Sequence, residues 1–144
     1  MTNVASINEG PLLIIPEDRV TLHELKCALD SLFMGSEFRD GTLFIVEGID
    51  VVCSVNLETD WKNIRTLSVF EHRGPRSKVM EKINELNGEV IFARFRCVGD
   101  ESISADFFSS YEGGLNVRQF VIQLRRFAET VAAIGGIIFS TPLR

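Results

Sequence analysis

Hydrophobic residues recur along the chain at two different spacings, and these spacings predict helices separated by groups of strands. Near the N-terminus, Thr21 and Glu24 form a capping box, and apolar residues then recur every three or four positions to about Met34. Gly35 is expected to end this helix. The clearest helical pattern covers 117–134, where an apolar stripe faces away from arginine and glutamine side chains. The sequence therefore predicts a helix near each end of the folded unit.

Short apolar runs rich in aromatic and β-branched residues predict strands between these helices. Three of them, 43–48, 49–56 and 64–72, follow an Asp-Gly turn signal at position 40 and are expected to pair as an antiparallel meander. Two more, 90–98 and 102–110, alternate in the same way and predict a hairpin. The sheet is therefore expected to be antiparallel.

A further helix is predicted between the meander and the hairpin. It follows Pro75, which suits a first helical turn, and has apolar residues at helical spacing from Val79 to Leu86 before an Asn-Gly pair that is expected to end it. The predicted order is thus α-β-β-β-α-β-β-α. Helices packed on one face of an antiparallel sheet, an α+β fold, are the economical arrangement for this order.

The chain length of 144 residues fits one domain with a single substantial core. We expect an N-terminal arm over 1–19, one α+β domain over 20–136 and a C-terminal tail over 137–144. The tail begins with the apolar run Ile137-Ile138-Phe139, which could pair on a sheet edge or dock on a second subunit.

The element order and several segments within it resemble the YbjN family, which shares the fold of type III secretion chaperones. The similarity covers about 20–134 and is carried by SKVMEKINELN at 77–87, FARFRC at 92–97 and VRQFVIQLRRFAETV at 117–131. It implies a compact domain, often paired as a homodimer, in proteins loosely described as sensory-transduction regulators. Chaperone relatives bind an unfolded client across an apolar surface. The family has no established catalytic residues, so none is transferred.

Composition and charge narrow the function classes. Hydrophobic residues make up 45% and charged residues 24% of the chain, as in ordinary globular proteins. No apolar run approaches the ~20 residues that cross a bilayer, and the start lacks a signal-peptide pattern, so a cytoplasmic protein without membrane contact is expected. The net charge is −5, although 62–96 holds 8 basic and 4 acidic residues. This local excess leaves RNA binding as a minor alternative.

The residue types that usually carry catalysis occur without suitable partners. His23 lies in the first turn of a predicted helix and His72 at the end of a predicted strand, where solvated or loop-stabilising roles are expected. Cys27, Cys53 and Cys97 are widely spaced and are expected to be reduced residues in or near the core. No calcium loop or phosphate-binding glycine motif is present. We therefore predict no catalytic residue, no cofactor and no metal site.

The predicted second hairpin has apolar side chains on both of its faces. If Ile91 and Phe95 point toward the helices, Val90 and Phe92 must point away, and Phe108 lies opposite to Phe107. A contiguous exposed patch of this kind usually marks an interface. A second copy of the chain, a client segment or the chain's own arm or tail could cover it. The predicted interface residues are Val90, Phe92, Arg94, Arg96 and Phe108.

Together these features favour a non-enzymatic, protein-binding or chaperone-like regulatory protein that acts as a homodimer. The main alternative is a small-molecule sensor or weak enzyme that uses a pocket between helices and sheet, which would require a deep concavity lined by converging polar groups.

Overall fold

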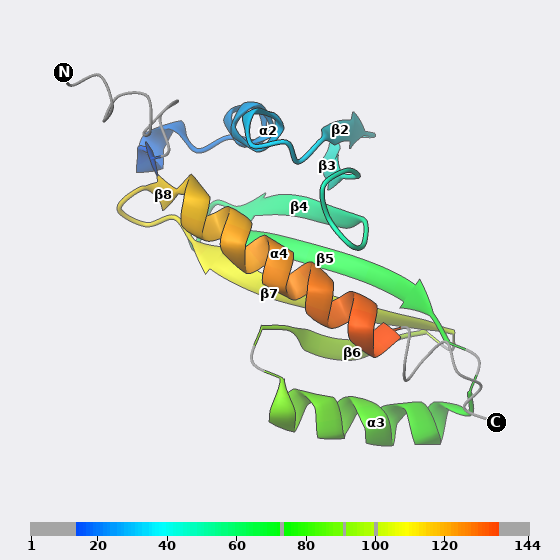
Figure 1. Cartoon of the computed structure of the whole chain (residues 1–144). Helices are drawn as coiled ribbons and strands as arrows, with labels where there is room; N and C mark the ends of the chain where they lie inside the picture. The colour runs from blue at the N-terminus through cyan, green and yellow to red at the C-terminus, as the bar shows by residue number, and fades with distance from the viewer. Residues whose placement is uncertain (1–13, 73, 91, 100, 136–144) are drawn as a thin grey trace.

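A six-stranded antiparallel sheet forms the centre of the computed structural model, which describes residues 14–72, 74–90, 92–99 and 101–135 (Figure 1). The strands lie in the order β2-β3-β4-β5-β7-β6, so the first four follow one another as a meander and β7 is inserted between β5 and β6. Their bounds are β2 (Ser36–Arg39), β3 (Thr42–Ile45), β4 (Cys53–Glu58), β5 (Asn63–Glu71), β6 (Arg94–Val98) and β7 (Ser102–Ser110).

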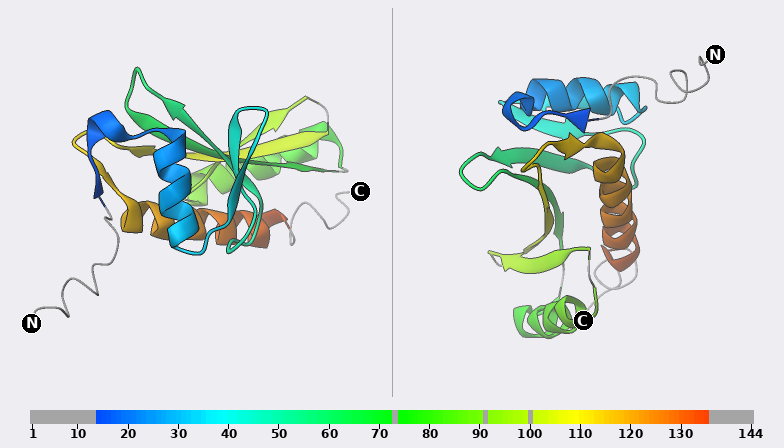
Figure 2. Two further views of the ribbon diagram at one scale, coloured as in Figure 1. Left: turned by 90° about the horizontal axis from the view of Figure 1, so that it is seen from above. Right: turned by 90° about the vertical axis from the view of Figure 1, so that its left-hand side faces the viewer.

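The helices lie on one face of this sheet. The sheet curves around α4 (Val117–Ile134), with α2 (Leu22–Ser31) beside the β2–β3 end and α3 (Arg76–Glu89) beside β6 (Figure 2). This arrangement confirms the predicted α+β class and element order. The opposite face of the sheet carries no helix in the described part of the chain, and we call it the helix-free face.

Two clusters of buried apolar side chains hold the helices on the sheet. The first joins Leu25 and Leu29 of α2 to Phe120 and Leu124 of α4, and the second joins α3 and β6 to the later turns of α4 around Phe127. Because α4 takes part in both clusters, its apolar stripe connects the two ends of the sheet. Burial of apolar surface contributes roughly 25 cal/mol per Å², so this shared stripe is a main source of stability.

Helix α2 begins and ends with specific polar contacts. The Thr21 hydroxyl accepts a 3.1 Å hydrogen bond from the Glu24 backbone N–H, as the predicted capping box requires. At the other end, the Asp30 carboxylate accepts hydrogen bonds from the Ser36 backbone N–H and hydroxyl and from Lys26. Burial alone would raise the pKa of Asp30, but these hydrogen bonds from Lys26 and Ser36 outweigh it and lower the pKa. Asp30 therefore joins α2 to β2 as a carboxylate.

Short elements outside the predicted order complete the fold. Strand β1 (Ile14–Ile15) pairs with β8 (Leu115–Asn116), and a 3-10 helix, η1 (Glu17–Arg19), follows β1. Ile15 is buried in the first apolar cluster, so this part of the expected N-terminal arm packs on the core. Strand β2 is also additional to the prediction and forms a hairpin with β3 across the recognised Asp-Gly turn. Residues 1–13 and the tail over 137–144 lie outside the described residues.

Candidate functional site

Strand register places a mixed polar and apolar surface on the helix-free face. One row of directly paired residues crosses the whole sheet and brings charged side chains from β2, β7 and β6 into line with two apolar ones from β3 and β5. From β2 to β6 this row reads Glu37, Phe44, Ser54, Leu67, Asp106 and Arg94. Side chains of alternate residues share a face, so Asp106 points away from the helices although it lies in an apolar strand.

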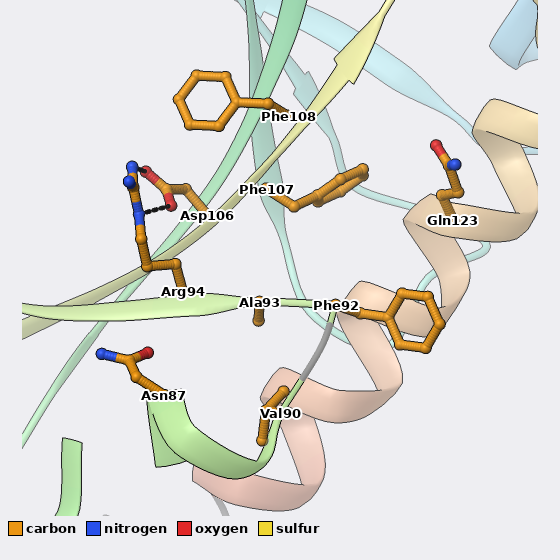
Figure 3. Close-up of a pocket in the computed structure, with 9 residues that line it drawn as sticks. All are labelled: Asn87, Val90, Phe92, Ala93, Arg94, Asp106, Phe107, Phe108 and Gln123. Carbon is orange, nitrogen blue, oxygen red and sulfur yellow. Dashed lines mark hydrogen bonds and ion pairs between the residues drawn. The ribbon is translucent and has the colours of Figure 1, made fainter. Parts of the chain in front are cut away.

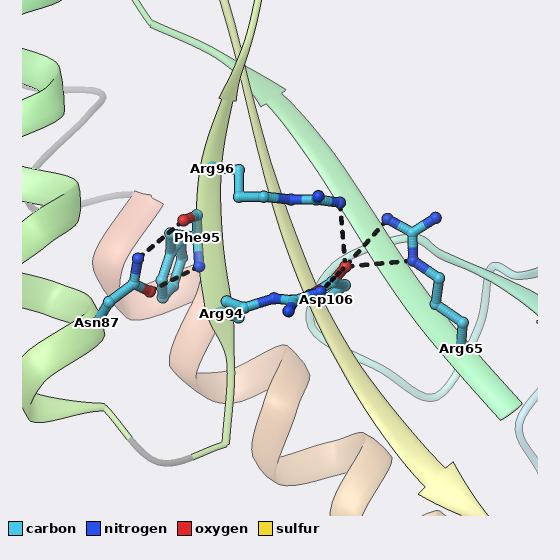
Figure 4. Close-up of polar contacts among 6 residues, drawn as sticks. All are labelled: Arg65, Asn87, Arg94, Phe95, Arg96 and Asp106. Atoms are coloured by element: carbon cyan, nitrogen blue, oxygen red, sulfur yellow. Dashed lines mark hydrogen bonds and ion pairs between the residues drawn. The ribbon is translucent and has the colours of Figure 1, made fainter. Parts of the chain in front are cut away.

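Three arginines surround the carboxylate of Asp106 (Figure 4). Arg65 donates from Nη2 and Nε at 3.0 and 3.2 Å, Arg94 donates at 3.3 and 3.4 Å, and Arg96 approaches with Nη2 at 3.5 Å. The arginines come from β5 and β6, the two neighbours of β7 in the sheet. We call these four residues the arginine cluster.

The arginine cluster presents positive charge to solvent. The Asp106 side chain is 1% exposed, whereas Arg65, Arg94 and Arg96 are 28%, 56% and 52% exposed. Three guanidinium charges therefore surround one carboxylate that solvent cannot reach. Each guanidinium has five N–H donors in a fixed planar fork, so most of the donors in the cluster are not used by Asp106. In a chain of net charge −5, this is a local concentration of positive charge, which attracts anionic groups.

Aromatic rings fix the directions of two arginines on this face. The Arg94 guanidinium lies over the Phe108 ring at 5.5 Å from its centroid, and Arg39 lies over Phe44 at 5.0 Å. Such cation–π contacts are worth about 0.5–1 kcal/mol at exposed sites. Arg94 is thus held toward Phe108 at one end of the arginine cluster, and Arg39 with Phe44 forms a similar pair at a distant strand.

A cavity of about 550 Å³ opens beside Arg94, where β6 begins (Figure 3). Strand β6 pairs with β7 only from Ser102 to Asp106, while β7 continues to Ser110. The space left beside the end of β7 is bounded by the last turn of α3, the segment before β6 and one side chain of α4. We call this cavity the notch; its lining residues are Asn87, Val90, Phe92, Ala93, Arg94, Asp106, Phe107, Phe108 and Gln123.

A side chain covers the middle of the outer edge of β6. Asn87 of α3 donates from Nδ2 to the Phe95 carbonyl at 2.9 Å and accepts from the Phe95 N–H at 2.8 Å (Figure 4). The amide thereby occupies the positions that a neighbouring strand would use. Exposed strand edges promote unwanted pairing, so Asn87 protects this edge while the end of β7 beside it has no such cover among the described residues.

Apolar side chains also reach solvent on the helix-free face. Val69 of β5, Val98 of β6 and Phe108 of β7 are exposed, and the partly buried Leu67 and Phe44 lie in the neighbouring row. Single exposed apolar residues are common on proteins. Phe33 and Trp61 are more exposed but lie in turns, whereas these three lie on a sheet face beside the arginine cluster, which makes that face the candidate binding surface.

The five predicted interface residues fall into two groups. Arg94, Arg96 and Phe108 lie on the helix-free face, as the alternation predicts. Phe92 does not, because β6 begins only at Arg94 and the Phe92 ring turns toward α4, where Arg126 stacks on it at 5.3 Å. Val90 ends α3 and packs against the second apolar cluster. The expectation that Val90 and Phe92 point away from the helices is therefore wrong, although both line the notch; Ile91 lies outside the described residues.

The basic residues of 62–96 that the structure describes do not form one surface. Arg76, Lys78 and Lys82 belong to α3 on the helix side, where Arg76 donates to the Gly99 carbonyl and Lys82 pairs with Glu85. The arginines of the arginine cluster lie on the other side of the sheet. The excess of positive charge in the sequence is thus divided between two faces.

The two histidines differ in burial, and so do the cysteines. His23 is exposed on α2 against Phe38, but His72 is buried, and neither of its ring nitrogens has a hydrogen-bond partner among the described residues. The expected exposed role of His72 is therefore wrong. Burial raises the pKa of the Cys53 thiol to about 12. Cys27 is exposed on α2, so the expectation that it lies in or near the core is wrong.

The described residues hold neither a metal-binding cluster nor a membrane-spanning helix. No three histidine, cysteine, aspartate or glutamate side chains within those ranges gather in a way that could hold a metal ion. Likewise, no described helix combines the length and apolar composition needed to span a bilayer.

Comparisons with known proteins show a similar fold in a solved structure. No family model and no curated protein matches the sequence. The crystal structure of YbjN from E. coli, provisionally described as a transcription regulator, superposes with a TM-score of 0.63 over 80% of this chain and 88% of that chain, at 15% identity. The chain therefore has a YbjN-like fold.

Proposed function

We propose that the chain is a non-enzymatic regulatory protein that binds a protein partner on the helix-free face of its sheet. The observation that carries this proposal is the composition of that face: exposed Val69, Val98 and Phe108 beside the arginine cluster, with no helix over them in the described residues. Arginine and aromatic side chains are enriched at protein interfaces, and the fully buried centre of an interface is more apolar than the rest of the surface. The YbjN-like fold supports a regulatory protein, since the YbjN structure is described as one.

The first partner that we expect is a second copy of the chain, and charge restricts how the two copies can meet. A two-fold contact centred on the arginine cluster would place two groups of three guanidiniums against each other, each with only one buried carboxylate. Like charges brought together at an interface cost several kcal/mol. The homodimer is therefore expected to centre on the apolar side chain of Val69 and to leave the arginine cluster at its rim.

Sedimentation velocity across a concentration series tests this proposal. The chain has a mass of 16.1 kDa, and the dimer is expected to dissociate in Val69→Asp because a carboxylate would be buried at its centre. Ile122→Asp is the matched control, since Ile122 on α4 is similarly exposed, at 45% against 56% for Val69, but lies on the helix side. A monomer at every concentration, or equal dissociation in both variants, would count against the homodimer.

A further inference from the structure

The end of β7 has an open hydrogen-bonding edge beside the notch. In an antiparallel sheet the backbone groups of successive residues point alternately to the two neighbouring strands. The Tyr111 N–H donates to the Lys62 carbonyl at 2.8 Å, so odd-numbered residues of this segment bond toward β5. The N–H and C=O groups of Phe108 and Ser110 consequently face the other way, beyond the beginning of β6, where no strand pairs with them among the described residues.

We propose that the notch binds an extended acidic segment of a partner protein, which adds to the sheet as a strand along Phe107–Ser110. Backbone hydrogen bonds to Phe108 and Ser110 would hold the segment, and an acidic side chain would lie on the helix-free face against the arginine cluster. This inference rests on the proposed function, because it names the kind of protein segment that the same face recognises. Strand addition uses main-chain bonds for affinity and alternate side chains for specificity.

Position and charge both favour a carboxylate opposite Phe108. A residue paired with Phe108 shares its face, and it would lie in the notch between the end of β7 and the Ala93 side of the chain, near Arg94 (Figure 3). The Arg94 guanidinium already leans over the Phe108 ring, and Arg65 is paired with Phe108 on the other side. A carboxylate at this point can accept bidentate hydrogen bonds from a guanidinium, which is the strongest common pairing for that group.

The side of the notch that faces α4 would contact every second residue of the bound segment. Phe107 points toward α4, where its ring lies 4.9 Å from that of Phe127, and Val90 and Phe92 also line the cavity. These apolar walls suit an apolar side chain. The segment that fits best therefore alternates acidic residues toward the arginines with apolar residues toward α4.

A protein segment fits this surface better than a nucleic acid does. Glu37 lies in the same row as Arg94, and Glu71 is paired with Ser102 on the same face. A phosphate backbone carries charge at every nucleotide and gains affinity from each phosphate that is neutralised, so these carboxylates and the net charge of −5 oppose it. A protein strand with separated carboxylates can place them against the arginines without bringing negative charge to Glu37 or Glu71.

Titration with synthetic peptides, followed by fluorescence anisotropy and by amide NMR of Phe108 and Ser110, tests the proposal. The probe is a short blocked peptide that alternates valine and glutamate, compared with a glutamine analogue and with an analogue N-methylated at its inward-facing amides. We expect both analogues to bind at least about ten-fold more weakly: the glutamine analogue loses charge-assisted hydrogen bonds to the guanidiniums, and the N-methylated analogue loses main-chain hydrogen bonds to Phe108 and Ser110. Exchange of the Phe108 and Ser110 amides should slow on binding.

Protein variants locate the binding site. Arg94→Gln should lower the affinity for the glutamate peptide by about ten-fold or more. Arg39→Gln, which alters the similar arginine–phenylalanine pair of Arg39 with Phe44, should leave that affinity unchanged. Absence of peptide binding, equal binding of the analogues, or equal effects of the two substitutions would overturn the proposal. So would equally tight binding of free glutarate or of oligothymidylate. Sedimentation of Val69→Asp is independent of the peptides, so failure here is distinguishable from failure of the homodimer.

Discussion

Replacement of Asp106 by asparagine tests the energetics of the arginine cluster. The substitution keeps the size of the side chain but removes the one negative charge among three guanidiniums, the nearest of which is 3.0 Å away. Breaking a fully buried ion pair costs about 3–5 kcal/mol, and an exposed pair contributes about 0–1 kcal/mol. Asp106 is buried but Arg94 and Arg96 are about half exposed, so water can hydrate the remaining charges. We expect a loss of about 2 kcal/mol in the free energy of unfolding.

Urea unfolding at low and high salt is the assay. After the substitution, repulsion among the three arginines remains, and about 1 M salt shortens the screening length to about 3 Å. The destabilisation by Asp106→Asn should therefore be smaller at high salt. Glu37→Gln is the control, because Glu37 pairs with Arg39 on the same face but is exposed, and it should not change stability measurably. A loss for Asp106→Asn that equals the control, or that does not depend on salt, would refute this reasoning.

Three further predictions concern the backbone, an acid and a thiol. Gly48→Ala should destabilise the fold by at least about 1 kcal/mol, because φ is +76° and the added Cβ would overlap the Phe33 carbonyl oxygen. Gly41→Ala, at φ +82° in open space, should lower the stability measured by thermal unfolding by less. Asp30 has a lowered pKa in the fold, so its contribution is present above the ordinary value of 3.8 and should be lost as pH falls below it; urea titration should show a smaller acid dependence in Asp30→Asn. The pKa of Cys53 is raised from 9.0 to about 12 in the fold, so this thiol should resist a thiol reagent at pH 8 while Cys27 reacts, and rapid labelling of Cys53 in folded protein would contradict this. The stability that the neutral Cys53 thiol contributes should decline as pH rises between these two pKa values.

The sequence predicts the helices and most strands because their patterns are long or strongly apolar. Strand β2 is not predicted, since Ser36–Arg39 is short and offers the core one large apolar side chain, Phe38. The recognised turn at position 40 was the available signal. Helix α3 also runs through the expected Asn-Gly stop to Glu89, because the Asn87 side chain bonds to β6 and does not end the helix.

The candidate site depends on contacts that sequence spacing does not reveal. Alternation correctly places Arg94, Arg96 and Phe108 on one face, but it cannot show that the strand begins after Phe92 and so assigns that ring to the wrong side. Asp106 is paired with arginines from two other strands. The one signal for it was a lone aspartate within an alternating apolar strand, and its partners follow only from the strand order β5-β7-β6.

Cysteine cross-linking gives the most direct test that the helix-free face binds a second copy of the chain. In a variant with Cys27→Ser and Cys97→Ser, the buried Cys53 should stay unreactive, and Val69→Cys supplies a new exposed thiol. A disulfide requires Cα atoms within about 7 Å, which a residue beside a two-fold axis satisfies with its own copy. We expect Val69→Cys to form a covalent dimer under mild oxidation much faster than Ile122→Cys in the same background. Equal rates for the two positions, or no cross-link through position 69, would contradict the proposed interface.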